Sequence, residues 1–185
     1  MSRGLGDVYK RQIGDKLVNY LEPKERDLAM VFQSYALYPQ MNIYDNIAFS
    51  LQVRKVPKKE IDKKVHHVAE LLGLENLLKQ RPKNLSGGQR QALSLLMATL
   101  KRPELLLLDE HTAALDPKTS VALMELTDEF VTGDHLTALM ITHHMEDALK
   151  YGNRLIVMKD GQIIKDLTKE EKGQLDITDY YAMFE

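Results

Sequence analysis

The chain has 185 residues, the size of about one domain, and its 44% hydrophobic content is enough for a real core. A net charge of −2 gives no overall positive field that would attract nucleic acid or anionic lipid. The sequence contains no cysteine, which excludes disulfides and thiolate metal sites and fits a reducing cytoplasm. No apolar run approaches the roughly 18 residues of a membrane helix, so we expect a soluble chain.

Residues 1–12 do not fit the pattern of the rest of the chain. The hexapeptide DVYKRQ, residues 7–12, looks like the translation of a transposon-type sequencing-library adapter. We therefore expect residues 1–12 to derive from cloning or assembly, and the native reading frame to begin near Ile13. The alternative is a native disordered tail.

From Ile13 onward the sequence alternates between predicted strands and helices. This alternation predicts an α/β fold with a mainly parallel sheet flanked by helices. The expected buried strands are the short apolar runs 28–32, 105–108 and 137–142.

The helices are predicted from apolar spacing and from their start and stop signals. A polar, helical stretch covers about 41–83, and Ser86 opens a helix that runs to about Leu100. Asp116-Pro117 marks a turn into a further helix. Near the C-terminus, Asp160-Gly161 between two apolar runs predicts a β-hairpin.

The segment Leu85-Ser86-Gly87-Gly88-Gln89 places a hydroxyl group and two glycines at the start of a predicted helix. Glycines let the backbone approach an anion closely, and a helix N-terminus offers free N–H groups with about half a positive charge. This arrangement suits a phosphate group. The structural alternative is a plain serine N-cap on an amphipathic helix.

LSGGQ is followed by three further elements in order: LLLLDE (105–110), Ala114-Leu115-Asp116 and Thr142-His143. With this order and spacing, the chain from about Ile13 to its end resembles the ATP-binding domains of ABC transporters. The resemblance implies a P-loop NTPase-type fold with a helical subdomain, approximately 41–100, inserted between the Q-loop and the signature LSGGQ. It also implies ATP and Mg²⁺ as cofactors.

The same resemblance assigns catalytic and metal-binding roles. Asp109 is the expected Walker B aspartate that helps to hold Mg²⁺, a hard cation that takes oxygen ligands. Glu110 is the expected general base for the attacking water. Gln33 is the expected Q-loop glutamine, which contacts the metal and the water, and His143 the switch histidine that binds the γ-phosphate. The alternatives are a helix N-cap or solvated turn for the Asp-Glu pair and a structural role for His143.

In ABC ATPases the signature of one subunit closes over the ATP that the other subunit holds. The residues expected to bind the nucleotide in this way are Leu85, Ser86, Gly87, Gly88 and Gln89, with Asp116 at the subunit junction. We therefore expect a homo- or heterodimer of ATPase domains that binds transmembrane permease subunits. The expected location is cytoplasmic, on the inner face of the cell membrane, with no nucleic acid partner.

Some features depart from the family pattern. The sequence contains no GxxxxGK[ST], the P-loop that cradles the phosphates and that the family places upstream of the Q-loop. The P-loop strand and helix are therefore expected to be missing, and this polypeptide is expected to be inactive. His111 and His144 stand where the family commonly has proline and aspartate, and we assign them no metal role.

The chain also resembles two different groups within the family. Its first part, 13–91, is similar to carbohydrate-importer ATPases, and the part from about Ala92 onward is similar to an amino-acid-type importer group. A fusion of two genes near residues 85–91 and an ordinary divergent subfamily both account for this change.

The leading functional interpretation is the ATPase subunit of an importer, with Tyr35–Gln40 and the helices that follow docking a coupling helix of the permease. For the aromatic residues of that segment, the alternative is simple core packing. The other function classes are a soluble ABC ATPase of the translation or DNA-repair type and a non-catalytic fragment.

Overall fold

The computed structural model describes residues 10–22, 25–34 and 36–183, so most of the adapter-like segment lies outside the described residues. The chain divides into two compact units, residues 1–140 and 141–185. Within the described ranges, no helix is long and apolar enough to cross a bilayer.

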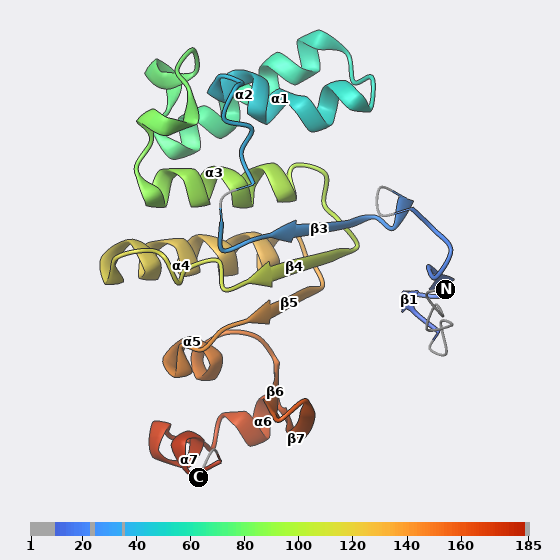
Figure 1. The fold of residues 1–185 in the computed structure, drawn as a ribbon, viewed down its shortest axis with the longest axis vertical. Helices are drawn as coiled ribbons and strands as arrows, with labels where there is room; N and C mark the ends of the chain where they lie inside the picture. Colours follow the sequence, from blue (N-terminus) through green and yellow to red (C-terminus); the bar gives the residue numbers. More distant parts are fainter. Residues whose placement is uncertain (1–9, 23–24, 35, 184–185) are drawn as a thin grey trace, which may run out of the picture. The chain divides into compact units, whose positions relative to one another are not determined.

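The first unit is built on a three-stranded sheet with the order β3-β4-β5 (Figure 1). The strands are Leu28–Val31 (β3), Leu105–Asp109 (β4) and Ala138–Ile141 (β5). β3 and β4 are parallel, with Leu28 opposite Leu105 and Val31 opposite Leu108. The three predicted strands are confirmed, each within one residue of its predicted ends.

Helices α3 (Gly87–Thr99) and α4 (Pro117–Gly133) cover one face of this sheet. Alternate strand residues point to that face, as expected for a pleated sheet. The shared core consists of Val31, Leu95, Leu106, Leu108 and Leu123. Both helices that the sequence predicted at Ser86 and Asp116 are confirmed, with these two residues as the N-caps.

Between β3 and α3 the chain forms α1 (Ile43–Val53) and α2 (Lys58–Leu72), which are followed by the short 3₁₀ helices η2 (Glu75–Leu77) and η3 (Pro82–Asn84) (Figure 1). α2 ends at Gly73, whose φ of 62° is a left-handed conformation that glycine adopts at low cost. Ile61, Val65, Val68 and Ala69 lie on one face of α2, in one core with residues of α1 and α3. The exact limits of a helical subdomain stay a prediction.

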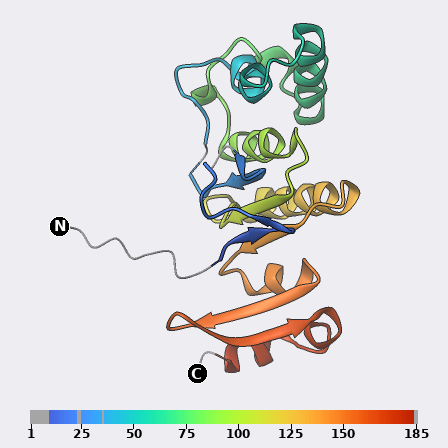
Figure 2. The same cartoon turned by 90° about the vertical axis from the view of Figure 1, so that its right-hand side faces the viewer.

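A small antiparallel pair, β1 (Gln12–Ile13) and β2 (Lys16–Leu17), precedes β3 (Figure 2). The second unit contains α5 (Met145–Lys150), the hairpin strands β6 (Arg154–Lys159) and β7 (Gln162–Thr168), and the helices α6 (Lys169–Lys172) and α7 (Ile177–Ala182). The hairpin predicted at Asp160-Gly161 is confirmed. Its buried side, Leu155 and Val157, packs against α5.

Candidate functional site

The segment LSGGQ begins helix α3 with a complete capping box. The backbone N–H of Gln89 donates to Ser86 Oγ at 3.2 Å, and the Ser86 N–H donates to Gln89 Oε1 at 3.0 Å. The expected structural role of Ser86 as an N-cap is therefore present. Because Ser86 Oγ accepts this bond, its own proton can still be donated to a ligand.

The two ends of LSGGQ differ in their surroundings. Leu85 is buried in the core that α1, α2 and α3 share, so its side chain anchors the segment. Gly87 and Gly88 occupy the first helical turn, where backbone N–H groups have no intrahelical acceptor. The residues that can offer donors to an anion are therefore Ser86, Gly87 and Gly88.

Gly88 is the point at which α3 approaches the start of α4. A Cβ atom on Gly88 would lie far closer to Thr119 Cγ2 than two carbon atoms can approach. Asp116, the N-cap of α4, accepts a hydrogen bond from the Thr119 N–H at 3.1 Å. The hydrogen bonds from Thr119 lower the pKa of Asp116, so its carboxylate is ionised at neutral pH. The N-terminal ends of α3 and α4 thus lie side by side, in contact through Gly88 and Thr119.

Asp109, Glu110 and Gln33, which we name the carboxyl-end group, lie where β4 and β3 end. The register pairs Val31 with Leu108, so Asp109, the last residue of β4, and Gln33, two residues after β3, lie near the same end of neighbouring parallel strands. Glu110 has a φ of 46°, a left-handed conformation that is uncommon for a residue with a side chain. This conformation comes directly after β4 and ends the strand.

Gln91 is a contributor that the sequence reasoning missed. Its side chain is almost fully buried in α3, and Nε2 donates to the carbonyl oxygen of Phe32 at 3.0 Å, next to Gln33. Oε1 of Gln91 is buried and has no hydrogen-bond partner within the described part of the chain. The signal in the sequence is a polar residue four positions before Leu95, on the apolar stripe of the helix.

His143 belongs to the second unit, so its proximity to the carboxyl-end group stays a prediction. It is exposed and stacks on His144, with ring centroids 4.5 Å apart and an interplanar angle of 30°. The His144 N–H donates to Thr142 Oγ1 at 3.0 Å. These contacts leave the predicted role of His143 untested.

His111, the residue after Glu110, is a buried anchor. Its Nε2 lies 3.1 Å from Thr127 Oγ1 on α4, and the Thr127 hydroxyl donates to the Leu123 carbonyl at 2.7 Å. Because the single Thr127 proton is already used, Nε2 of His111 must be the donor. Desolvation by burial lowers the pKa of His111 to about 4, so the ring is neutral at physiological pH.

Within the described ranges, no three His, Cys, Asp or Glu side chains gather as a metal-binding cluster. Mg²⁺ commonly uses only one or two protein oxygen ligands and completes its shell with water and phosphate. The Asp109 carboxylate and the Gln33 amide oxygen are of the right chemical type for that role. Their placement at adjacent strand ends fits such a partial ligand set.

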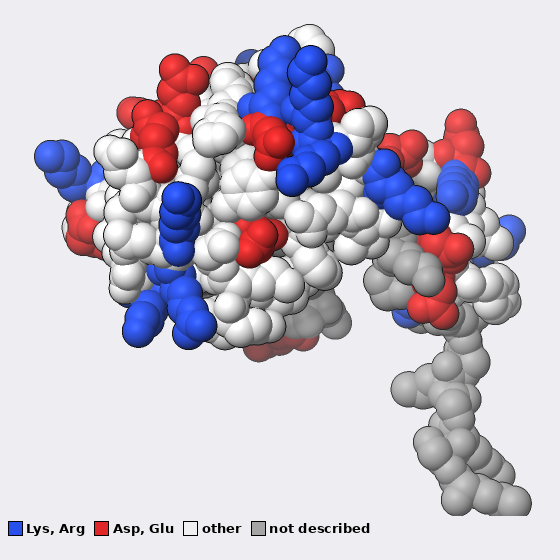
Figure 3. Space-filling model, turned by 90° about the horizontal axis from the view of Figure 1, so that it is seen from above, with Lys and Arg blue, Asp and Glu red and all other residues white. Residues whose placement is uncertain are grey.

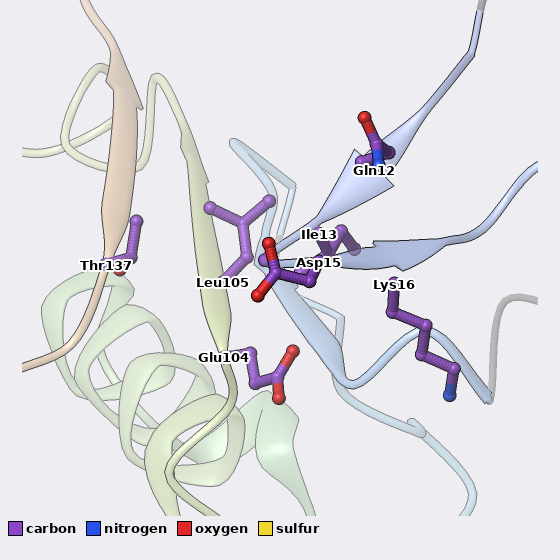
Figure 4. Close-up of a pocket in the computed structure, with 8 residues that line it drawn as sticks. Gln12, Ile13, Asp15, Lys16, Glu104, Leu105 and Thr137 are labelled. Carbon is purple, nitrogen blue, oxygen red and sulfur yellow. The ribbon is translucent and has the colours of Figure 1, made fainter.

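A depression of about 850 Å³ lies elsewhere, beside the β1–β2 turn (Figure 4). Asp15 and Lys16 line it together with Glu104, Leu105 and Thr137, which stand at or just before the starts of β4 and β5. In open α/β sheets ligands bind at the carboxyl ends of strands, which is the opposite end. This depression is therefore separate from the carboxyl-end group.

An α/β domain with LSGGQ at a helix start and carboxylates after an apolar strand belongs to the ATP-binding class of ABC proteins. The sequence pattern of the ABC transporter family matches residues 7–113, and the chain is a member of that family. It is 46% identical over 162 residues to the trehalose/maltose import ATP-binding protein MalK of Thermococcus litoralis, covering 84% of this chain and 43% of MalK.

Two other relatives show similar agreement. The oligosaccharides import ATP-binding protein MsmX of Bacillus subtilis is 46% identical over 158 residues, covering 85% of this chain and 42% of MsmX. The sn-glycerol-3-phosphate import ATP-binding protein UgpC of Bordetella avium is 46% identical over 149 residues, covering 80% of this chain and 41% of UgpC. The chain thus spans less than half the length of these relatives.

These matches extend across residues 85–91, where we expect the resemblance to change from carbohydrate importers to an amino-acid-type group. An alignment that covers 84% of the chain must include those residues, because the remainder is too short to reach them from either end. A fusion of two related genes would align in the same way, so the fusion hypothesis stays a prediction. The similarity to carbohydrate importers is confirmed.

The contact between Gly88 and Thr119 can be tested by a pair of substitutions. We expect Gly88→Ala to lower the free energy of unfolding by about 1–3 kcal/mol, because the added methyl group overpacks the contact. Thr119→Ser removes Cγ2 and keeps the hydroxyl group, so the double variant should recover most of this loss. Urea unfolding of both variants and of Thr119→Ser alone measures the effect. No recovery in the double variant would contradict the contact.

Burial of His111 predicts a pH-dependent stability. The folded-state pKa of about 4 lies below the usual value of 6.5, so the unfolded state binds more protons between these values. Stability should therefore fall as pH decreases from 6.5 towards 4, by at most about 1.4 kcal/mol per pH unit from this group. In His111→Gln, which keeps a donor for Thr127, this part of the slope should vanish. Equal slopes in both proteins would rule out the burial effect.

Proposed function

We propose that this chain is part of the ATP-binding subunit of an ABC importer for a sugar, an osmoprotectant or a related organic solute. The observation that carries the proposal is the register of β3 and β4, which sets Gln33 and Asp109 at adjacent strand ends. The names of the relatives, which concern trehalose/maltose, oligosaccharides and sn-glycerol-3-phosphate, support the substrate class. The individual solute is not assigned.

In this proposal, each member of the carboxyl-end group has one task. Asp109 and Gln33 would hold Mg²⁺, which would supply positive charge next to the phosphate oxygens. Glu110 orients the attacking water and accepts its proton as the water oxygen bonds to the γ-phosphorus, while the bond from the γ-phosphorus to the bridging oxygen breaks and ADP leaves with that oxygen. The left-handed backbone of Glu110 ends the strand, so the residue stands at the carboxyl end of β4 beside Asp109.

The signature segment acts on the nucleotide of a partner subunit. Ser86 donates its hydroxyl proton, and Gly87 and Gly88 donate backbone N–H groups, to the γ-phosphate oxygens. Asp116 lies at the subunit junction, next to this segment through the Gly88–Thr119 contact. His143 completes the site with a hydrogen bond to the γ-phosphate. ATP then favours the closed dimer because it binds that state more tightly.

The sequence contains no GxxxxGK[ST], so we propose that this polypeptide on its own neither binds ATP tightly nor hydrolyses it. That loop supplies the backbone N–H cradle, the phosphate-binding lysine and the hydroxyl ligand of Mg²⁺.

A surface for a permease subunit follows β3. Tyr35, the first residue of the segment Tyr35–Gln40, lies outside the described residues. Tyr38 is 38% exposed and packs against Phe49 with tilted rings, the centroids 4.8 Å apart and the planes at 55°. Asn46 fixes Tyr38 by accepting its N–H at 2.8 Å and donating to its carbonyl at 3.1 Å. The aromatic pair is thus both packed and accessible, which suits docking of a coupling helix.

The alternatives are less well supported. A soluble ABC ATPase of the DNA-repair type would have a long insertion between the Q-loop and the signature, whereas here α1 and α2 form one short helical segment. A non-catalytic module has no need for the combination of Gln33, Asp109, Glu110 and LSGGQ. The permease-bound subunit therefore remains the proposal.

The lack of a P-loop predicts that MgATP leaves the thermal unfolding of the purified chain unchanged. A ligand at 100 times its dissociation constant would stabilise the fold by about 2.7 kcal/mol, which shifts the melting temperature by several degrees. A P-loop-containing ABC ATPase measured in parallel shows that the assay detects binding. A clear MgATP-dependent stabilisation of this chain would contradict the proposal of inactivity.

Docking through Tyr38 predicts co-purification with a permease. We expect the chain to be retained by the permease pair of an oligosaccharide importer when both are co-expressed, and Tyr38→Ala to reduce retention by about tenfold. Tyr20→Ala is the matched control, since Tyr20 is 88% exposed and precedes the docking segment. Retention on ribosomes or DNA in place of the permease would favour the alternative classes.

A further inference from the structure

A second concave surface of the first unit is lined by basic side chains and has no role in the proposed ATPase chemistry. It has a volume of about 450 Å³ and lies between the end of α1, the middle of α2 and the turn after α3. We name it the cationic pocket. Among the residues that the structure describes, its charged lining residues are Arg54, Lys64, Lys101 and Arg102, and none of the lining residues is acidic.

The local charge around this pocket is opposite to that of the whole chain. Residues 54–64 contain six Lys or Arg and two acidic residues, a net charge of +4 (6 − 2) within a chain of −2. Of the two acids, Asp62 accepts a hydrogen bond from the Tyr44 hydroxyl, and Glu60 lies 3.5 Å from Lys64. Figure 3 shows Lys and Arg side chains gathered on the face that carries α1 and α2.

The four cations differ in how they are engaged. The guanidinium group of Arg54 has no hydrogen-bond or ion-pair partner among the residues that the structure describes. Lys101 is paired with Asp27 at 2.5 Å, and Arg102 with Asp134 at 2.5 Å. These exposed pairs contribute little by themselves, but they hold two cations at the pocket, and each cation keeps further N–H donors.

Two further features of the cationic pocket are the backbone conformation at its rim and the apolar side chains of its floor. Lys55 and Arg102 have φ values of 58° and 46°, a left-handed conformation that long side chains rarely adopt. The floor is formed by Leu51, Val56 and Leu100, of which Leu51 is buried. Together, a cationic rim and an apolar floor match a ligand with an anionic group on a carbon skeleton.

A purely structural explanation exists for part of this arrangement. Helices α1 and α3 both end at the pocket, and cations near a helix C-terminus stabilise its partial negative charge. The two helix ends together carry about one negative charge, which Arg54 alone can offset. The other three cations, Lys64, Lys101 and Arg102, are paired with Glu60, Asp27 and Asp134, so the helix ends do not account for their position at the pocket. Lys64 lies in the middle of α2, so it does not serve a helix end.

We propose that the cationic pocket is a binding site for the phosphate group of an anionic organic ligand, independent of the proposed ATPase site. Arg54 and Lys64 bind the phosphate oxygens directly, and Lys101 and Arg102 contribute charge from the opposite side. Two sources share this chemistry: a soluble organic phosphate and the headgroup of an anionic phospholipid. Because the proposal uses no residue of the carboxyl-end group, it stands or falls separately from the ATPase function.

The test uses the purified full chain with two probes. Pyrophosphate binding is measured by calorimetry, and lipid binding by co-sedimentation with phosphatidylcholine vesicles that contain or lack phosphatidylglycerol. We expect the double variant Arg54→Gln/Lys64→Gln to bind at least about tenfold more weakly. Lys79→Gln/Lys83→Gln removes the same charge from exposed positions outside the pocket and should change binding less than about twofold. Thermal unfolding of each variant confirms the fold.

Each outcome decides the proposal. Binding of pyrophosphate alone, or only of vesicles with phosphatidylglycerol, supports the site and identifies the source, and binding of both supports the shared chemistry. Equal losses in the two double variants would show a general effect of surface charge and overturn the site. The absence of binding for both probes, or a pocket variant that loses stability but keeps its affinity, would overturn it as well.

Discussion

The parallel pairing of β3 with β4 is the constraint on which the functional part of this structure depends. One register brings Val31 opposite Leu108, so Asp109 and Gln33, one and two residues further along their strands, lie at the same edge of the sheet. Val31 of β3 and Leu106 and Leu108 of β4 are buried in one core with residues of α3 and α4, and this packing holds the two strands in place. The core thereby fixes the spacing of the polar groups.

Much of this arrangement could be predicted from the sequence because the relevant signals are local. Apolar runs gave the three strands, and Ser86 and Asp116 marked the helix starts through their capping chemistry. The signature and the carboxylates after β4 indicated the family, which the comparison confirmed. Local signals suffice where a residue's role depends on its neighbours in sequence.

The rest depends on contacts between distant segments, which no local pattern contains. Gln91 meets the carbonyl of Phe32 across 59 positions, and its side-chain amide looked like an ordinary polar residue of a helix. From the sequence, Gly88 is expected to let the backbone approach a phosphate. In the structure it also lies against Thr119 of α4. His111 read as a simple departure from the family pattern and is a buried link to Thr127. The overall charge of −2 likewise hid a positive cluster, because composition averages over surfaces.

The hydrogen bond from the Gln91 side chain to the Phe32 carbonyl fixes where α3 lies along β3. Sliding α3 along β3 would break the bond to Phe32 and leave a second buried polar atom of the same side chain unpaired, beside Oε1. Positions of α3 in which this hydrogen bond is broken are therefore unfavourable. The helix and the loop at Gln33 consequently move together or separate. Any force that turns the signature end of α3 must carry Phe32 with it or release it in a single step.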